Sequence, residues 1–141
     1  MTWLIDTNVL SELRKGQRTA ASVRRWIEAV PEPDLFVSVI TIGEVRRGVE
    51  LLRRRDAIAA SALEQWLLRL IDVFGHRVLP VDLAVAERWG RLGIPDAVPV
   101  GDGLIAATAL VHGLTLVTRD TRDVGRTGVR VLDPFEPTGQ R

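Results

Sequence analysis

Short apolar runs alternate along this chain with longer segments in which apolar residues recur every three or four positions. Apolar runs of three to five residues are typical of buried strands, and the longer periodic segments are typical of amphipathic helices. We expect strands at residues 3–5, 35–39, 78–81, 114–118 and 129–132. Because helical segments separate these strands, the pattern predicts an α/β fold with a central parallel sheet of four to five strands flanked by helices.

Helix signals fill the intervals between the strands. Asp56 and Asp82 are typical N-caps, proline follows the segment 19–30, and Gly113 ends the segment 103–111. We expect helices at 8–14, 19–30, 41–54, 57–74, 83–92 and 103–111, and a loop at 93–101. No repeat or interior linker divides the sequence. The pattern therefore predicts one domain over residues 1–133 and a frayed or extended C-terminal tail at 134–141.

Composition restricts the chemistry. The 141 residues suit one compact core, and no apolar run approaches the ~20 residues that span a bilayer. The first apolar stretch ends at Asp6 and does not resemble a signal peptide, so we expect a cytoplasmic protein without membrane association. The absence of cysteine excludes disulfides, thiolate nucleophiles and zinc–thiolate sites.

The charge of the chain is nearly balanced, at +1, but its basic residues are unusual. All but one of the 19 are arginine, and Lys15 is the exception. Arginine suits planar partners such as phosphate. High-GC codon usage gives the same bias, so this composition is compatible with a nucleic-acid substrate and does not identify one.

Carboxylates cluster at the predicted carboxyl edge of the sheet, where ligands bind in parallel α/β folds. Asp6 follows the first strand, Glu44 lies in the first turn of the helix after the second, and Asp120 follows the fourth. Asp102 opens the helix that precedes the fourth strand. Each ionised pair ~4 Å apart repels by about 4 kcal/mol at an effective dielectric near 20. Such a cluster stays ionised only around a cation, and oxygen ligands favour Mg²⁺ or Mn²⁺ over zinc.

Each of these carboxylates also has a purely structural explanation. Asp6 and Asp102 are each placed to cap a helix, and Asp120 is placed in a turn. Thr41 and Glu44 have the spacing of a capping box, in which the glutamate binds an amide of its own helix. For any one of these residues taken alone, we favour the structural explanation. Four independent caps need not share one edge of the sheet, so we interpret the set as a site.

Four segments carry a resemblance to a known family. They are residues 5–13 (IDTNVLSEL), 38–48 (SVITIGEVRRG), 102–109 (DGLIAATA) and 116–123 (LVTRDTRD). In order and spacing they resemble the acidic motifs of PIN-domain ribonucleases, specifically the VapC-type toxins of type II toxin–antitoxin systems and their FitB-like branch. The resemblance extends from Trp3 to about Asp133 and implies a PIN-like three-layer sandwich.

The resemblance implies roles for the acidic residues. Asp6, Glu44 and Asp102 match the core acidic positions of the family, and Asp120 matches a position that holds Asn or Asp in relatives. Asp6 and Asp102 are expected to be the most direct Mg²⁺ ligands, with Mn²⁺ able to substitute. Glu44 is expected to orient water or a second ion, and Asp120 to complete the metal site.

Other residues are expected to support this cluster. Thr118 is placed to hydrogen-bond a carboxylate or a metal-bound water, and Asn8 lies in the first motif. Asp123 is a further candidate, although Val124 stands where the family often has Phe, which leaves its role open.

The resemblance also implies a reaction and partners. Metal-activated water would hydrolyse the phosphodiester bonds of tRNA, rRNA or mRNA and leave 5′-phosphate and 3′-hydroxyl ends. A cognate VapB-type antitoxin would insert a segment, with an arginine, toward the acidic pocket. Homodimers and toxin–antitoxin hetero-oligomers are expected.

Basic and aromatic residues suggest how RNA would be held. Arg46, Arg47 and Arg119 are candidate contacts to the RNA backbone, as are Arg14 and Lys15, and the alternative is an ordinary solvated helix face. The tryptophans of the helical apolar patterns are expected to be core residues, so base stacking would be minor: Trp26, Trp66 and Trp89.

Two alternative functions stay open. One is a catalytically silent PIN-fold binding module, which the presence of all four acidic residues disfavours. The other is a metal-independent ribonuclease that uses His76 and His112, although both resemble ordinary surface or cap residues.

Overall fold

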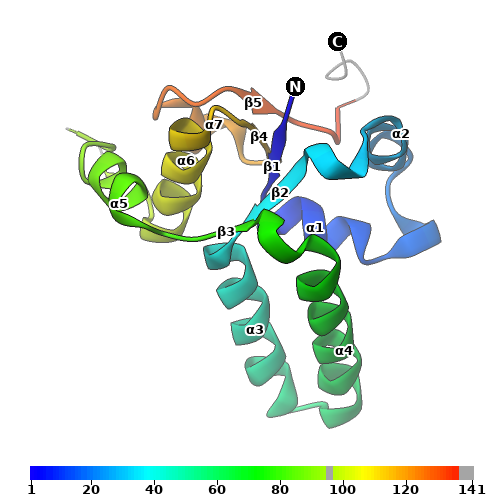
Figure 1. Ribbon diagram of the computed structural model, residues 1–141. Helices are drawn as coiled ribbons and strands as arrows, with labels where there is room; N and C mark the ends of the chain where they lie inside the picture. The colour runs from blue at the N-terminus through cyan, green and yellow to red at the C-terminus, as the bar shows by residue number, and fades with distance from the viewer. Residues whose placement is uncertain (95–96, 137–141) are drawn as a thin grey trace.

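The computed structural model describes residues 1–94 and 97–136, and within them it shows a five-stranded sheet in the order β3-β2-β1-β4-β5 (Figure 1). All neighbouring strands are parallel. The strands are β1 (Trp3–Ile5), β2 (Leu35–Ser38), β3 (Val78–Leu79), β4 (Thr115–Val117) and β5 (Val131–Leu132). This sheet confirms the predicted α/β fold.

Helices and short 3₁₀ turns connect the strands. The helices are α1 (Thr7–Leu13), α2 (Ala21–Ala29), α3 (Val39–Arg53), α4 (Ala57–Phe74), α5 (Leu83–Gly90), α6 (Val100–His112) and α7 (Thr121–Gly125), with turns η1 (Gly16–Arg18), η2 (Glu32–Asp34) and η3 (Gly75–Arg77). Two predicted N-caps are confirmed, because Asp56 and Asp82 accept hydrogen bonds from backbone amides of α4 and α5 at 3.0 Å. Gly113 ends α6 in the left-handed conformation, at φ 67°.

Two predicted helix starts were wrong in ways that affect the candidate site. Helix α3 begins two residues early, because the Ser38 hydroxyl caps it by accepting from the Ile40 amide at 3.0 Å. Glu44 therefore lies in the second turn and does not form the predicted capping box. Helix α6 begins at Val100, which places Asp102 inside its first turn and not at its N-cap. Helix α7, which the pattern did not predict, begins directly after Asp120.

Helices cover both faces of the sheet and make the three-layer arrangement. Ile5, Val37 and Val117 belong to the core on one face, together with residues of α1, α2 and the end of α4. Leu4 and Leu116 belong to the core on the other face, with residues of α6 and α7. Successive residues of β1 and β4 thus enter opposite cores, as the two-residue period of a strand requires.

Two peripheral features complete the fold. Helices α3 and α4 form a hairpin that extends away from the sheet (Figure 1), and ion pairs of 2.6–3.3 Å join Arg46 and Arg53 to Glu50 and Glu64. Within the predicted tail, the carbonyl of Phe135 accepts a hydrogen bond from the Ser22 hydroxyl at 2.9 Å. Residues 137–141 of the tail and 95–96 of the predicted loop lie outside the described residues. No helix in the described part of the chain is long and apolar enough to cross a membrane.

Replacing Ser38 with alanine tests the start of α3. Ser38→Ala is expected to lower the free energy of unfolding by about 1–2 kcal/mol, because the Ile40 amide loses its partner. Ser61→Ala, on the exposed side of α4, is the control and is expected to change it by less than about 0.5 kcal/mol. Urea unfolding measures both, and equal effects would contradict the cap.

Candidate acidic site

The two central strands, β1 and β4, end side by side, and Asp6 leaves the sheet at that point. Its backbone amide donates to the Val117 carbonyl at 2.9 Å, so the strand pairing continues one residue past β1. Its side chain is only 7% exposed, and Oδ1 accepts from the Thr7 amide at 2.8 Å. Asp6 therefore caps α1, which confirms its structural explanation. Its other carboxylate oxygen, Oδ2, does not take part in this cap.

Thr118 connects that second oxygen to β4. The buried Thr118 hydroxyl donates to Asp6 Oδ2 at 2.7 Å and accepts from Asn8 Nδ2 at 3.1 Å and from the Asp120 amide at 3.0 Å. Asn8 Oδ1 in turn accepts from the Arg119 amide at 3.1 Å. Two of the predicted supporting residues, Thr118 and Asn8, thus lie where they orient Asp6 and the loop that carries Asp120.

Glu44 approaches the same edge from α3. Its Oε1 accepts from the Thr7 hydroxyl at 2.5 Å, and the Thr41 hydroxyl lies 3.2 Å from that same hydroxyl. A Cβ atom placed on Gly101 would lie 2.9 Å from Glu44 Oε2. The Glu44 carboxylate therefore rests against the first turn of α6, one residue from Asp102, in space that glycine leaves open.

Electrostatic coupling shows that these carboxylates share one region. Burial raises the pKa of Asp6, and the charges of Glu44 and Asp120 raise it further, against its two stabilising hydrogen bonds. Burial also raises the pKa of Asp102, followed by the charges of Asp6, Asp120 and Asp123. The structure therefore brings together all four predicted acidic residues and the more doubtful Asp123.

The chemical type of the ligands in this cluster suits a divalent cation. The cluster offers only oxygen ligands, and burial together with neighbouring negative charge raises the pKa values of Asp6 and Asp102, a cost of ionisation that a cation relieves. Within residues 1–94 and 97–136, however, no three Asp, Glu or His side chains are grouped closely enough to hold a metal ion as they stand. The histidines do not join the cluster, since His112 ends α6 at the opposite end from Asp102 and His76 is exposed in η3.

The structure distinguishes the candidate arginines from one another. Arg46 contacts Glu64 at 2.6 Å and Glu50 at 3.2 Å, so its guanidinium is engaged within the α3–α4 hairpin. Arg47 is exposed. The guanidinium of Arg119 lies over the ring of Phe135, 4.2 Å from its centroid. Arg46 is therefore the least available of the three to a phosphate backbone.

The prediction that the helical tryptophans are core residues was only partly correct. Trp26 is buried, Trp66 is half-buried, and Trp89 is 38% exposed. Sequence reasoning also missed Thr7, which binds Glu44 through its hydroxyl and Asp6 through its amide. Its place directly after the first acidic residue was the one available signal.

The sequence of this chain is similar to the sequences of known proteins. Residues 3–128 match the family described as the PIN domain. The VapC ribonuclease Y4jK of Sinorhizobium fredii is 34% identical to this chain, over 95% of the chain and 98% of the relative. Toxin FitB of Neisseria gonorrhoeae is 35% identical, over 94% and 97% respectively.

Solved structures of related proteins are similar to this chain in fold. In the crystal structure of FitAcB from Neisseria gonorrhoeae, a chain 33% identical to this one matches it with a TM-score of 0.86, over 96% of this chain and 99% of that chain. A toxin–antitoxin complex from Klebsiella pneumoniae contains a chain that is 30% identical, with a TM-score of 0.72, over 96% and 99% respectively.

Replacing Asp102 tests whether burial and the neighbouring carboxylates make its ionised form unfavourable in the folded protein. The raised pKa of Asp102 means that, without metal, its contribution to stability is fully present below the unfolded-state pKa of about 4 and is lost as the pH rises through the folded value. Asparagine does not ionise and avoids this loss. In EDTA at pH 7, Asp102→Asn is expected to unfold at a higher urea concentration than the unsubstituted chain, with the difference vanishing below pH 4. A variant less stable at pH 7 would contradict the raised pKa of Asp102.

Proposed function

This chain belongs to the PIN-domain family, and from that membership we propose that it is a metal-dependent endoribonuclease, the toxin of a toxin–antitoxin pair. The observation that carries the proposal is the acidic cluster, in which Asp6, Glu44, Asp102 and Asp120 gather at the carboxyl edge of the sheet. Relatives named VapC ribonuclease and toxin FitB support the activity and the biological role.

Asp6 and Asp102 would hold the principal Mg²⁺ or Mn²⁺ ion, with Glu44 and Asp120 completing its surroundings. A bound divalent cation supplies an activated water and neutralises charge at the phosphate. Oxygen ligation by carboxylates is what these ions prefer. The support from this chain is the ligand type and the raised pKa values of Asp6 and Asp102, which burial and then neighbouring negative charge cause.

The remaining residues of the site would orient these groups. The Thr118 hydroxyl and the Thr7 amide hold the two oxygens of Asp6 in a defined direction. The Thr7 hydroxyl holds Glu44 Oε1, which leaves Oε2 without a hydrogen bond from the described residues and able to accept one from the attacking water. Because water attacks, and not the ribose 2′-hydroxyl, the products would carry 5′-phosphate and 3′-hydroxyl ends.

The partners that we propose follow from the relatives. The chain in the Klebsiella complex is part of a toxin–antitoxin assembly, which supports a cognate VapB-type antitoxin here. We propose that this antitoxin covers the acidic cluster and that the chain also forms homodimers. The RNA substrates would be cellular tRNA, rRNA or mRNA, which places the activity in the cytoplasm.

Asp102→Asn tests the proposed chemistry. With Mg²⁺ and structured RNA, the variant is expected to lose more than about 100-fold in cleavage rate, since even outer partners of metal ligands contribute 10- to 100-fold. EDTA should abolish cleavage by the unsubstituted protein. Asp72→Asn, an exposed carboxylate on α4, is the control and should retain full activity. Cleavage that survives EDTA, or 2′,3′-cyclic phosphate ends, would contradict the mechanism.

Gly101→Ala tests the position of Glu44 separately from its identity. The added Cβ displaces the Glu44 carboxylate, which lies at the flexible end of its side chain, while alanine favours the helix. Cleavage is expected to fall by about 10- to 100-fold, as misplaced catalytic groups lose activity, with no loss of thermal stability. Gly90→Ala, which meets open space on α5, should change neither. Full RNA cleavage by Gly101→Ala would contradict the proposal that cleavage requires the Glu44 carboxylate at its observed position.

A further inference from the structure

A cavity lies directly beside the acidic cluster, and Glu44 forms part of its wall. It has a volume of about 270 Å³ and lies between α1, α3 and α4. This is close to the lower end of the roughly 300–1,000 Å³ of small-molecule sites, a size that suits a single nucleotide better than a longer stretch of RNA. Its walls include Thr7, Ser11, Arg14, Glu44, Gly48 and Trp66.

The walls of this cavity combine three kinds of recognition chemistry. Thr7, Ser11 and Arg14 follow one another at helical spacing on one face of α1, and they provide two hydroxyls and a cation. Arg14 is exposed and makes no ion pair with any other described residue. Trp66, from α4, provides an aromatic surface. Hydroxyls, a free guanidinium and an aromatic ring are the groups that bind ribose, phosphate and base.

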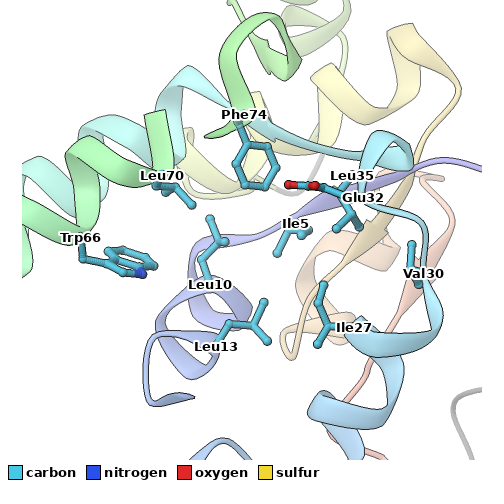
Figure 2. Close-up of a pocket in the computed structure, with 10 residues that line it drawn as sticks. All are labelled: Ile5, Leu10, Leu13, Ile27, Val30, Glu32, Leu35, Trp66, Leu70 and Phe74. Carbon is cyan, nitrogen blue, oxygen red and sulfur yellow. The ribbon is translucent and has the colours of Figure 1, made fainter. Parts of the chain in front are cut away.

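The neighbouring pocket has the opposite character. A pocket of about 310 Å³ on the other side of Trp66 is lined by apolar side chains except for Glu32, and Figure 2 shows Leu10, Leu13 and Leu70 among them, with Trp66 at one end. Trp66 is thus shared between an apolar pocket and a mixed polar one. Only the polar cavity also contains Glu44, the carboxylate proposed to act on the substrate.

We infer that the cavity between α1, α3 and α4 is a binding site for one nucleotide of single-stranded RNA, adjacent to the phosphate that is cleaved. The base lies against Trp66, the hydroxyls of Thr7 and Ser11 face the ribose, and Arg14 contacts the next phosphate. This inference rests on the proposed function, because it places the cavity next to a scissile phosphate at Glu44. It revises the expectation that base stacking is minor, since a half-buried tryptophan lies beside the acidic cluster.

Gly48 offers a way to fill the cavity without disturbing its walls. A Cβ atom at Gly48 would have no other atom within 4 Å, so a side chain can begin there without a clash, and Gly48→Leu adds bulk at the wall of the cavity. Gly43→Leu is the matched control, because it lies on the same helix, also meets open space and does not line the cavity. Urea unfolding of both variants verifies that they fold equally well.

Binding is measured on the Asp102→Asn protein, so that the probe is not cleaved. The probe is a fluorescein-labelled single-stranded hexaribonucleotide of random sequence, followed by fluorescence anisotropy. Gly48→Leu is expected to weaken binding by about 5- to 150-fold, the loss expected for one base–aromatic stack, and Gly43→Leu to leave it unchanged. Arg14→Ala should weaken binding and reduce the dependence of log Kd on log salt concentration by about one phosphate contact.

Unchanged RNA affinity in Gly48→Leu would overturn the inference. If that variant instead loses its co-expressed antitoxin during purification, the cavity is a site for a protein segment and not for a nucleotide. Failure of the proposed function has a different signature: no RNA cleavage by the unsubstituted protein and no RNA binding by any variant, which overturns the nucleotide site as well.

Discussion

The hydrogen bond from the Thr118 hydroxyl to Asp6 is the interaction on which the site depends. It joins the ends of β1 and β4, which are neighbours in space although 112 residues separate the two side chains in sequence. Thr118 can donate only one proton, and its two acceptor positions are taken by Asn8 and the Asp120 amide. One buried hydroxyl thus sets the direction of a carboxylate, an amide side chain and the loop before α7.

The same arrangement has an energetic cost. Burial and neighbouring negative charge oppose the ionised forms of Asp6 and Asp102, and the fold tolerates this because the core on both faces of the sheet holds the strand ends in place. On the α3–α4 hairpin, by contrast, Glu50 and Glu64 each form ion pairs with arginine, which is the usual way in which a fold compensates negative charge. Asp6, Glu44, Asp102 and Asp120 make no such ion pair with the other described residues, and this is what distinguishes the proposed cation site from a structural network.

Sequence patterns predicted the sheet and the position of the acidic residues well, because both follow from local signals. The strands are short apolar runs, and parallel strands that leave one edge bring Asp6 and Asp120 together whatever the loop details. The helix starts were predicted less well. Ser38 competes with Thr41 as the cap of α3, and both have suitable side chains, so only packing decides between them. The burial of Trp66 and the ion pairs of Arg46 depend on how α3 and α4 cross, which no single segment encodes.

We propose that Asp6 and Asp102, far apart in sequence, are ligands of one cation. Mn²⁺ binding followed by electron paramagnetic resonance tests it directly, without reference to RNA or catalysis. The unsubstituted protein is expected to bind Mn²⁺ in competition with Mg²⁺, and Asp6→Asn and Asp102→Asn are each expected to weaken that binding by at least about 10-fold. Equal Mn²⁺ affinity in the unsubstituted protein and in both variants would contradict it.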